Sequence, residues 1–169
     1  PLQARTIEQV SKHAAIELSS GEKSTLMHVI QIILRKRQAN VWPGGMVLKD
    51  DEGNILFSVG DEVQESVKMD VAMENIKAYH AQGKRQIVFS QFSTALEEFE
   101  KRINAQGIRA VRFDGSTKPK QREEIKNNFY KAKGEAAKWD VVLVHYRTGG
   151  AGLNLTAATV THILDEEWN

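Results

Sequence analysis

The chain has 169 residues, no cysteine, 41% hydrophobic residues and a formal net charge of +1. This composition is that of an ordinary soluble globular domain, excludes disulfides and thiolate metal sites, and lacks the strong positive charge that marks many nucleic-acid binders. No apolar run reaches the roughly 20 residues that span a bilayer, and no signal-peptide pattern opens the sequence. We therefore expect an intracellular protein without a membrane partner, and the first residue, Pro1, suggests a piece of a longer chain.

Up to about residue 83 the sequence pattern is mostly helical. Apolar residues at helical spacing predict helices over 6–18, 24–38 and 63–81. Two short apolar runs flank the turn residues Asp-Glu-Gly-Asn at 51–54, which predicts a β-hairpin over 46–59. We expect residues 1–83 to form an N-terminal helical part in which the hairpin is a surface insertion.

From residue 84 onward, strand and helix patterns alternate. Runs of Val, Ile and Leu predict strands over 86–90, 108–113, 140–145 and 160–165, and amphipathic segments predict helices over 93–105 and 119–131. Thr94 and Glu97 have the spacing of a capping box. Apolar strands separated by helices indicate an α/β fold with a parallel sheet covered on both faces, which we assign to residues 84–169.

Several segments imitate catalytic motifs without supplying their chemistry. In residues 20–25, Glu22 separates the glycine from the lysine and no strand precedes them, so we expect no P-loop. In Ile163-Leu-Asp-Glu-Glu167, acidic residues follow a strand, as in nucleoside triphosphatases that bind Mg²⁺. Without a P-loop there is no phosphate-bound Mg²⁺ for these carboxylates to coordinate, so we interpret them as an acidic turn. The histidines are scattered and no nucleophile has a positioned base, so we assign no metal site and no catalytic residue.

Two loops follow buried strands, at the edge where parallel sheets bind nucleotides and phosphates. Residues 147–155 carry three glycines in the four positions 149–152, which lets the backbone approach a ligand closely. Residues 113–118 offer small hydroxyls and backbone amides before a helix, with Arg122 one turn further in, and such a loop suits a phosphate oxygen. The basic run from Lys118 to Lys138 is either a solvated helix face or a DNA-facing edge.

Taken together, these segments resemble the second RecA-like lobe of superfamily-two helicases, specifically that of the Swi/Snf-type ATPases. The resemblance is strongest over 84–169 and is carried by Ile87-Val-Phe-Ser-Gln-Phe92, by Phe113-Asp-Gly-Ser-Thr117 with Arg122, by Gly149-Gly-Ala-Gly-Leu-Asn-Leu155, and by Asp165-Glu-Glu-Trp-Asn169. Where the family usually has Ser-Thr, this chain has His145-Tyr146, and Tyr146 could still donate to a phosphate.

The resemblance implies one lobe of an ATP-driven translocase on double-stranded DNA. The implied partners are duplex DNA and the first RecA-like lobe of the same protein; ATP and Mg²⁺ would be cofactors of the intact two-lobe protein, with none held tightly by this chain alone. The residues implied on the nucleotide side are Gly150, Gly152 and Asn154. The residues implied on the DNA side are Ser90, Gln91, Gly115, Ser116, Thr117, Lys118, Arg122, Arg147, Thr148 and Trp168.

The sequence ends before the arginine-finger motif that the family has next, and it contains no first lobe, so we expect no ATP hydrolysis by this chain alone. Two alternatives stay open: the lobe of a strand-separating helicase or restriction motor, and a non-catalytic DNA-binding or regulatory module with a RecA-like fold. We expect the location to follow the genome: cytoplasm or nucleoid in a bacterium or phage, nucleus in a eukaryote.

Overall fold

The computed structural model describes residues 2–19, 26–49, 52–60, 65–130, 138–149 and 157–166. The chain divides into two compact units, Pro1–Lys68 and Met69–Asn169. This division falls earlier than the change of sequence pattern near residue 83, so most of the third helix is grouped with the sheet. Among the described helices, none has the length and apolar character needed to cross a membrane.

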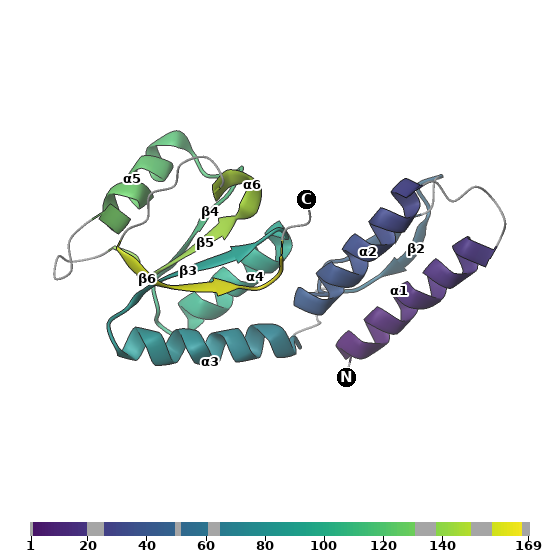
Figure 1. The fold of residues 1–169 in the computed structure, drawn as a ribbon, viewed down its shortest axis with the longest axis horizontal. Coiled ribbons are helices and arrows are strands. Elements are labelled where there is room, and N and C mark those ends of the chain that lie inside the picture. Colours follow the sequence, from purple (N-terminus) through teal and green to yellow (C-terminus); the bar gives the residue numbers. More distant parts are fainter. Residues whose placement is uncertain are drawn as a thin grey trace. The chain divides into compact units, whose positions relative to one another are not determined.

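The first unit combines two helices with a two-stranded hairpin (Figure 1). Its elements are α1 (Leu2–Ser19), α2 (Leu26–Val41), β1 (Val47–Lys49) and β2 (Ile55–Ser58). The strands pair antiparallel, with Val47 opposite Ser58. The hairpin predicted from the turn residues at 51–54 is therefore confirmed.

The core of the first unit joins its helices to the hairpin. Val10 of α1 and Ala39 of α2 are buried in one cluster with Met46 and Val59, which flank the hairpin. Just after α2, a Cβ added to Gly44 would lie 2.6 Å from the indole ring of buried Trp42. Only glycine lets the backbone pass so close to this ring, so the approach to the hairpin depends on Gly44.

The second unit is a parallel sheet between helices. Its elements, with the helix that enters it, are α3 (Val67–Ala81), β3 (Arg85–Ser90), α4 (Ser93–Ala105), β4 (Ala110–Phe113), α5 (Pro119–Tyr130), β5 (Val141–His145), α6 (Tyr146–Gly149) and β6 (Ala158–Ile163). The strands run parallel in the order β4-β5-β3-β6. Figure 1 shows α3 and α4 on one face and α5 on the other. The predicted α/β fold with a parallel sheet is confirmed.

Side chains that alternate along the strands fill both helix–sheet layers. On one face, Phe113 of β4 and Val144 of β5 pack with Phe129 of α5 in a single buried cluster. The other face is covered by α4, whose Phe99 and Ile103 are fully buried. This period of two is what a strand covered on both sides requires, and it explains the continuous apolar runs in the sequence.

Three local predictions from the sequence were wrong. Phe92 is the N-cap of α4 and no side chain caps the helix, so Thr94, the second helical residue, cannot begin a capping box. Residues 147–149, which we expected in a loop, belong to the short helix α6. Strand β6 ends at Ile163 rather than at Asp165, because Asp165 turns its carboxylate toward the end of β3.

Candidate functional site at the carboxyl rim of the sheet

The segments that follow the four strands meet at one edge, which we call the carboxyl rim. The rim comprises residues 90–92, 114–118, 145–149 and 164–166. Parallel pairing brings together these segments that are distant in the sequence. The described candidate residues lie on it or, for Arg122, one turn behind it. Gly150, Gly152, Asn154 and Trp168 lie outside the described residues.

The loop after β4 is organised by the buried carboxylate of Asp114. Its Oδ1 accepts hydrogen bonds from the backbone N–H of Ser116 at 2.8 Å and from the Ser116 hydroxyl at 2.6 Å. The Asp114 N–H donates to Oγ1 of Thr117 at 2.9 Å, and the Thr117 hydroxyl donates to the carbonyl of Arg112 at 3.3 Å. Thr117 is thus buried within the loop, while Gly115, Ser116 and Lys118 are exposed.

The same contacts set the ionisation of Asp114. Burial disfavours the charged carboxylate, but the hydrogen bonds from Ser116 and the positive charge of Arg112 outweigh burial, and the pKa of Asp114 is lowered. The nearest Arg112 nitrogen lies 3.4 Å from Oδ2 of Asp114. The loop therefore holds an ionised carboxylate that accepts hydrogen bonds and orients Ser116.

Arg122 lies behind this loop. Its Nε donates to the carbonyl of Thr117 at 2.8 Å and its Nη2 to the carbonyl of Asp114 at 2.6 Å, and its guanidinium sits 5.0 Å from the centre of the Phe113 ring. These charge-assisted bonds fix the backbone on either side of Gly115 and Ser116. The resemblance implied that Arg122 lies on the DNA side. In the structure, at least two of its N–H donors form hydrogen bonds with carbonyls of the chain itself.

A second group of contacts joins the ends of β3 and β6. Ser90 is fully buried; its hydroxyl donates to Oδ2 of Asp165 and accepts from the Phe92 N–H at 3.1 Å. The Gln91 N–H donates to Oδ1 of Asp165 at 3.1 Å, and the Gln91 side chain donates to the carbonyl of Glu166 at 3.0 Å. Asp165 was not among the candidate site residues, because its partners lie about 75 residues earlier and sequence spacing gives no signal of them.

The end of β5 continues directly into α6. The Tyr146 hydroxyl donates to the backbone carbonyl of Asp165 at 2.7 Å, and its ring stacks on Phe89 with centroids 5.5 Å apart. Tyr146 therefore uses its donor within the chain, which corrects the suggestion that it could donate to a phosphate. Arg147, one residue on, is exposed, and its N–H donates to Nδ1 of His145 at 3.3 Å.

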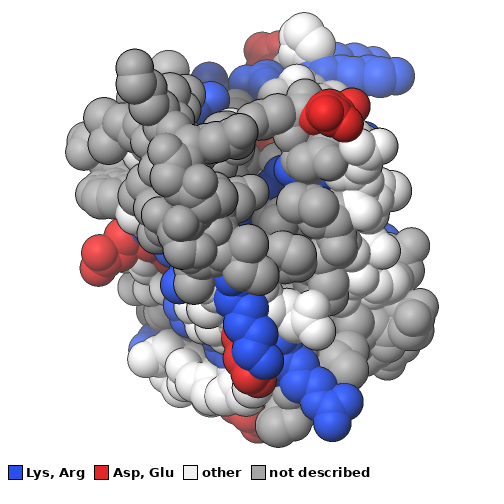
Figure 2. Space-filling view, turned by 90° about the vertical axis from the view of Figure 1, so that its right-hand side faces the viewer, with Lys and Arg blue, Asp and Glu red and all other residues white. Residues whose placement is uncertain are grey.

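The charge of the rim is mixed. Lys118 and Arg147 are exposed, and so is the acidic Glu166. The basic run after Lys118 is partly neutralised, since Nζ of Lys138 lies 2.5 Å from Glu124. In the view of Figure 2, blue basic and red acidic side chains both occur among the residues drawn in colour. Among the described residues, no three His, Asp or Glu side chains gather closely enough to hold a metal ion.

The sequence is similar to a family of helicase domains and to longer proteins that include a helicase. The helicase conserved C-terminal domain family matches residues 67–169, more than half of the chain. The whole chain is 27% identical to an uncharacterized ATP-dependent helicase of Mycoplasma pneumoniae and 27% identical to the SNF2 domain-containing protein ENL1 of Oryza sativa subsp. japonica. It spans 15% and 17% of the lengths of these two proteins.

Two solved structures from Sulfolobus solfataricus share the fold over the entire chain. A SWI2/SNF2 ATPase C-terminal domain has a TM-score of 0.72 at 19% identity, with 69% of that chain covered. A SWI2/SNF2 ATPase core in complex with dsDNA has a TM-score of 0.70 at 20% identity, with 33% covered. The fold is thus RecA-like, as expected. The chain belongs to the helicase conserved C-terminal domain family, and its fold is similar to those of the two SWI2/SNF2 ATPase structures.

Proposed function

We propose that the chain is the second motor lobe of an ATP-dependent translocase on double-stranded DNA. In this proposal it contacts the phosphate backbone of the duplex and forms one side of an ATP cleft, whose other side lies on the first lobe of a longer protein. That protein works where the genome is: in the cytoplasm or nucleoid of a bacterium or phage, or in the nucleus of a eukaryote.

The observation that carries the proposal is the convergence of exposed donors at the carboxyl rim. Lys118 in the loop after β4 and Arg147 in α6, directly after β5, are both exposed cations. Ser116 is exposed beside Lys118, and its N–H and hydroxyl both donate to Asp114 in this structure. Hydroxyls, amides and cations of this kind bind phosphates without reading bases. The Sulfolobus ATPase core with the same fold was solved in complex with dsDNA, which supports a duplex as the partner.

The candidate DNA-side residues fall into two roles. Gly115, Lys118, Arg147 and Thr148 are at least partly exposed and are proposed to contact phosphates. Gln91 and Ser116 are also at least partly exposed and are proposed to contact phosphates, but each donates within the chain as well, Gln91 to Glu166 and Ser116 to Asp114. Ser90, Thr117 and Arg122 donate hydrogen bonds to other residues of the chain and are proposed to hold the contacting segments in place. Trp168 remains a predicted contact that the described residues do not include.

ATP and Mg²⁺ belong, in this proposal, to the intact two-lobe protein. The nucleotide-side candidates Gly150, Gly152 and Asn154 lie outside the described residues, so no step is derived from their geometry. Bound between the lobes, ATP would supply the free energy of phosphoryl transfer for opening and closing the cleft. The residues of this chain alternately grip and release the phosphate backbone, and such binding is nonspecific and weakens with salt.

The test is an ATPase assay on the full-length protein with duplex and single-stranded DNA, together with a strand-displacement assay. We expect duplex DNA to stimulate ATP hydrolysis without strand separation. Strand displacement would identify the lobe of a helicase instead. DNA binding without any ATP hydrolysis would identify a non-catalytic module.

A further inference from the structure

Asp165 links the ends of three strands at the rim. Its carboxylate accepts hydrogen bonds from the Ser90 hydroxyl and the Gln91 N–H, both at the end of β3. Its backbone carbonyl accepts the hydroxyl of Tyr146, at the end of β5. Asp165 itself follows β6 by two residues. We call Ser90, Gln91, Tyr146 and Asp165 the Asp165 junction.

Tyr146 spans an entire strand to make its contact. In the sheet, β3 lies between β5, which precedes Tyr146, and β6, which precedes Asp165. The tyrosine ring stacks on Phe89 of β3 at an interplanar angle of 19°, and its hydroxyl then reaches the carbonyl of Asp165 at 2.7 Å. A short Ser or Thr side chain at position 146 lacks the length to reach across, so this contact depends on tyrosine.

We propose that Tyr146 is a positioning residue that holds the start of α6 in a fixed register with the end of β3. Through Asp165, the exposed Arg147 and the half-buried Thr148 then keep a constant spacing from Gln91. The inference rests on the proposed function in one respect: it takes these residues to contact phosphates. When the spacing of these residues is already fixed in the free protein, DNA binding does not have to order them, and less conformational entropy is lost on binding.

The first test measures amide hydrogen exchange at Gln91 in the full-length protein and its Tyr146→Phe variant. The variant keeps the ring that stacks on Phe89 and removes only the donor. Loss of one neutral hydrogen bond implies exchange at Gln91 about three- to ten-fold faster. Unchanged exchange at Gln91, or an equal acceleration throughout β3 and β5, would overturn the proposal, since the latter indicates a general loss of stability.

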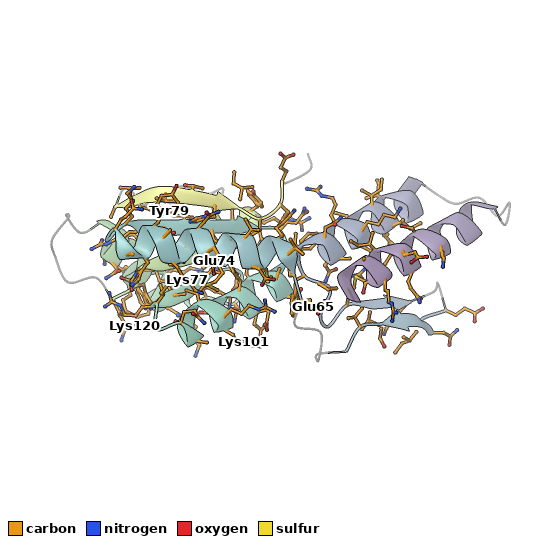
Figure 3. The ribbon with its side chains drawn as sticks, turned by 90° about the horizontal axis from the view of Figure 1, so that it is seen from below. Glu65, Glu74, Lys77, Tyr79, Lys101 and Lys120 are labelled. Atoms are coloured by element: carbon orange, nitrogen blue, oxygen red, sulfur yellow. The ribbon has the colours of Figure 1, made fainter. Side chains whose placement is uncertain are left out.

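Tyr79→Phe is the matched control. The Tyr79 hydroxyl has no hydrogen-bond partner among the described residues, so its removal changes neither the packing of the ring nor a polar contact. Figure 3 shows Tyr79 on α3, near β6. Exchange at Gln91 is expected to stay at the wild-type rate in this variant, and an acceleration equal to that in Tyr146→Phe would overturn the assignment to Tyr146.

The second test separates binding from turnover. In Tyr146→Phe, the duplex concentration that gives half-maximal ATPase activity should rise about three- to ten-fold while the maximal rate stays near the wild-type value. A lower maximal rate with unchanged half-saturation would overturn the positioning role. If the wild-type protein shows no duplex-stimulated activity, the proposed motor function fails, and Gln91 exchange still decides whether Tyr146 orders the Asp165 junction.

Discussion

Arg147 and Arg122 are both arginines near the carboxyl rim, but their surroundings differ. Arg147 is exposed on the first turn after β5. Arg122 is half-buried and donates to the carbonyls of Thr117 and Asp114. The two side chains should therefore respond to mutation in different assays, the first in DNA binding and the second in folding stability.

Arg147→Ala should weaken duplex binding about equally for all DNA sequences, because a phosphate contact carries no base information. The slope of log affinity against log salt should fall in magnitude by about 1, since one fewer counterion-releasing contact is made. The measurement is a binding series over salt concentration with the full-length protein. The control is Lys101→Ala on α4, where Lys101 pairs with Glu97 at 3.4 Å (Figure 3). Equal effects of the two variants would contradict the assignment of Arg147.

Arg122→Ala should lower the free energy of unfolding by about 2–3 kcal/mol, because it removes a charged donor from two carbonyls of the loop. Urea unfolding of wild type and variant measures the difference. Arg122→Lys should recover only part of the loss, since an ammonium lacks the planar fork that reaches both carbonyls. If Arg122→Ala leaves stability unchanged and impairs only DNA binding, the side chain is a direct contact instead.

At the scale of elements, strand β6 is held to its neighbours by a buried amide. Gln86 of β3 is fully buried; its Nε2 donates to the carbonyl of Ile76 on α3 at 3.0 Å, and its Oε1 lies 2.7 Å from Nε2 of His162 on β6. Because an amide oxygen can only accept, Nε2 of His162 carries the proton. One side chain thus connects α3, β3 and β6.

Burial lowers the pKa of His162, and this makes the attachment of β6 sensitive to pH. The unfolded chain, with an imidazole pKa of about 6.5, binds the proton more readily than the folded chain. The contribution of neutral His162 to the stability of the folded chain is therefore complete above about pH 6.5. It is lost as the pH falls from there through the lower pKa of the folded state. Urea unfolding at pH 7.5 and 5.5 should show a decrease in wild type that is smaller in His162→Gln. An equal decrease in both would contradict the role of His162.

The helices and strands were predictable because each depends on local apolar spacing. Helix α4 occupies the predicted range 93–105, and β3 and β5 differ from prediction by one residue at the start. The exposure of Thr159 and Ile163 on alternate positions of β6 was not predictable, because it follows from the place of β6 at the edge of the sheet. Sequence patterns do not specify strand order.

The candidate site was predictable in position but not in detail. Loops after parallel strands must meet at one edge, so the residues after Ser90, Phe113 and His145 could be grouped from the sequence. Which of their polar groups face inward depends on partners from other strands, as with Ser90 and Asp165. The resemblance to a family supplied candidates for contact, and packing divides them into exposed and internal side chains.

At the scale of the whole molecule, the two-lobe proposal assigns phosphoryl transfer to the two lobes acting together. Phosphate-cradling amides of a P-loop and an arginine finger are both expected elsewhere in a longer protein. The purified 169-residue chain should therefore release no phosphate from ATP above background, with or without duplex DNA. A cooperative unfolding transition and the activity of the full-length protein serve as controls, and clear turnover by the chain would contradict the two-lobe proposal.

The position of β3 inside the sheet has a consequence for biosynthesis. It is the first strand of the parallel sheet to leave the ribosome, yet its two neighbours, β5 and β6, are both translated after β4. Until they emerge, the apolar stretch from Ile87 to Phe89 has two open edges, a condition that favours pairing with other nascent chains. The interval between translation of Ser90 and of Ile163 is therefore when the newborn polypeptide most needs chaperone protection.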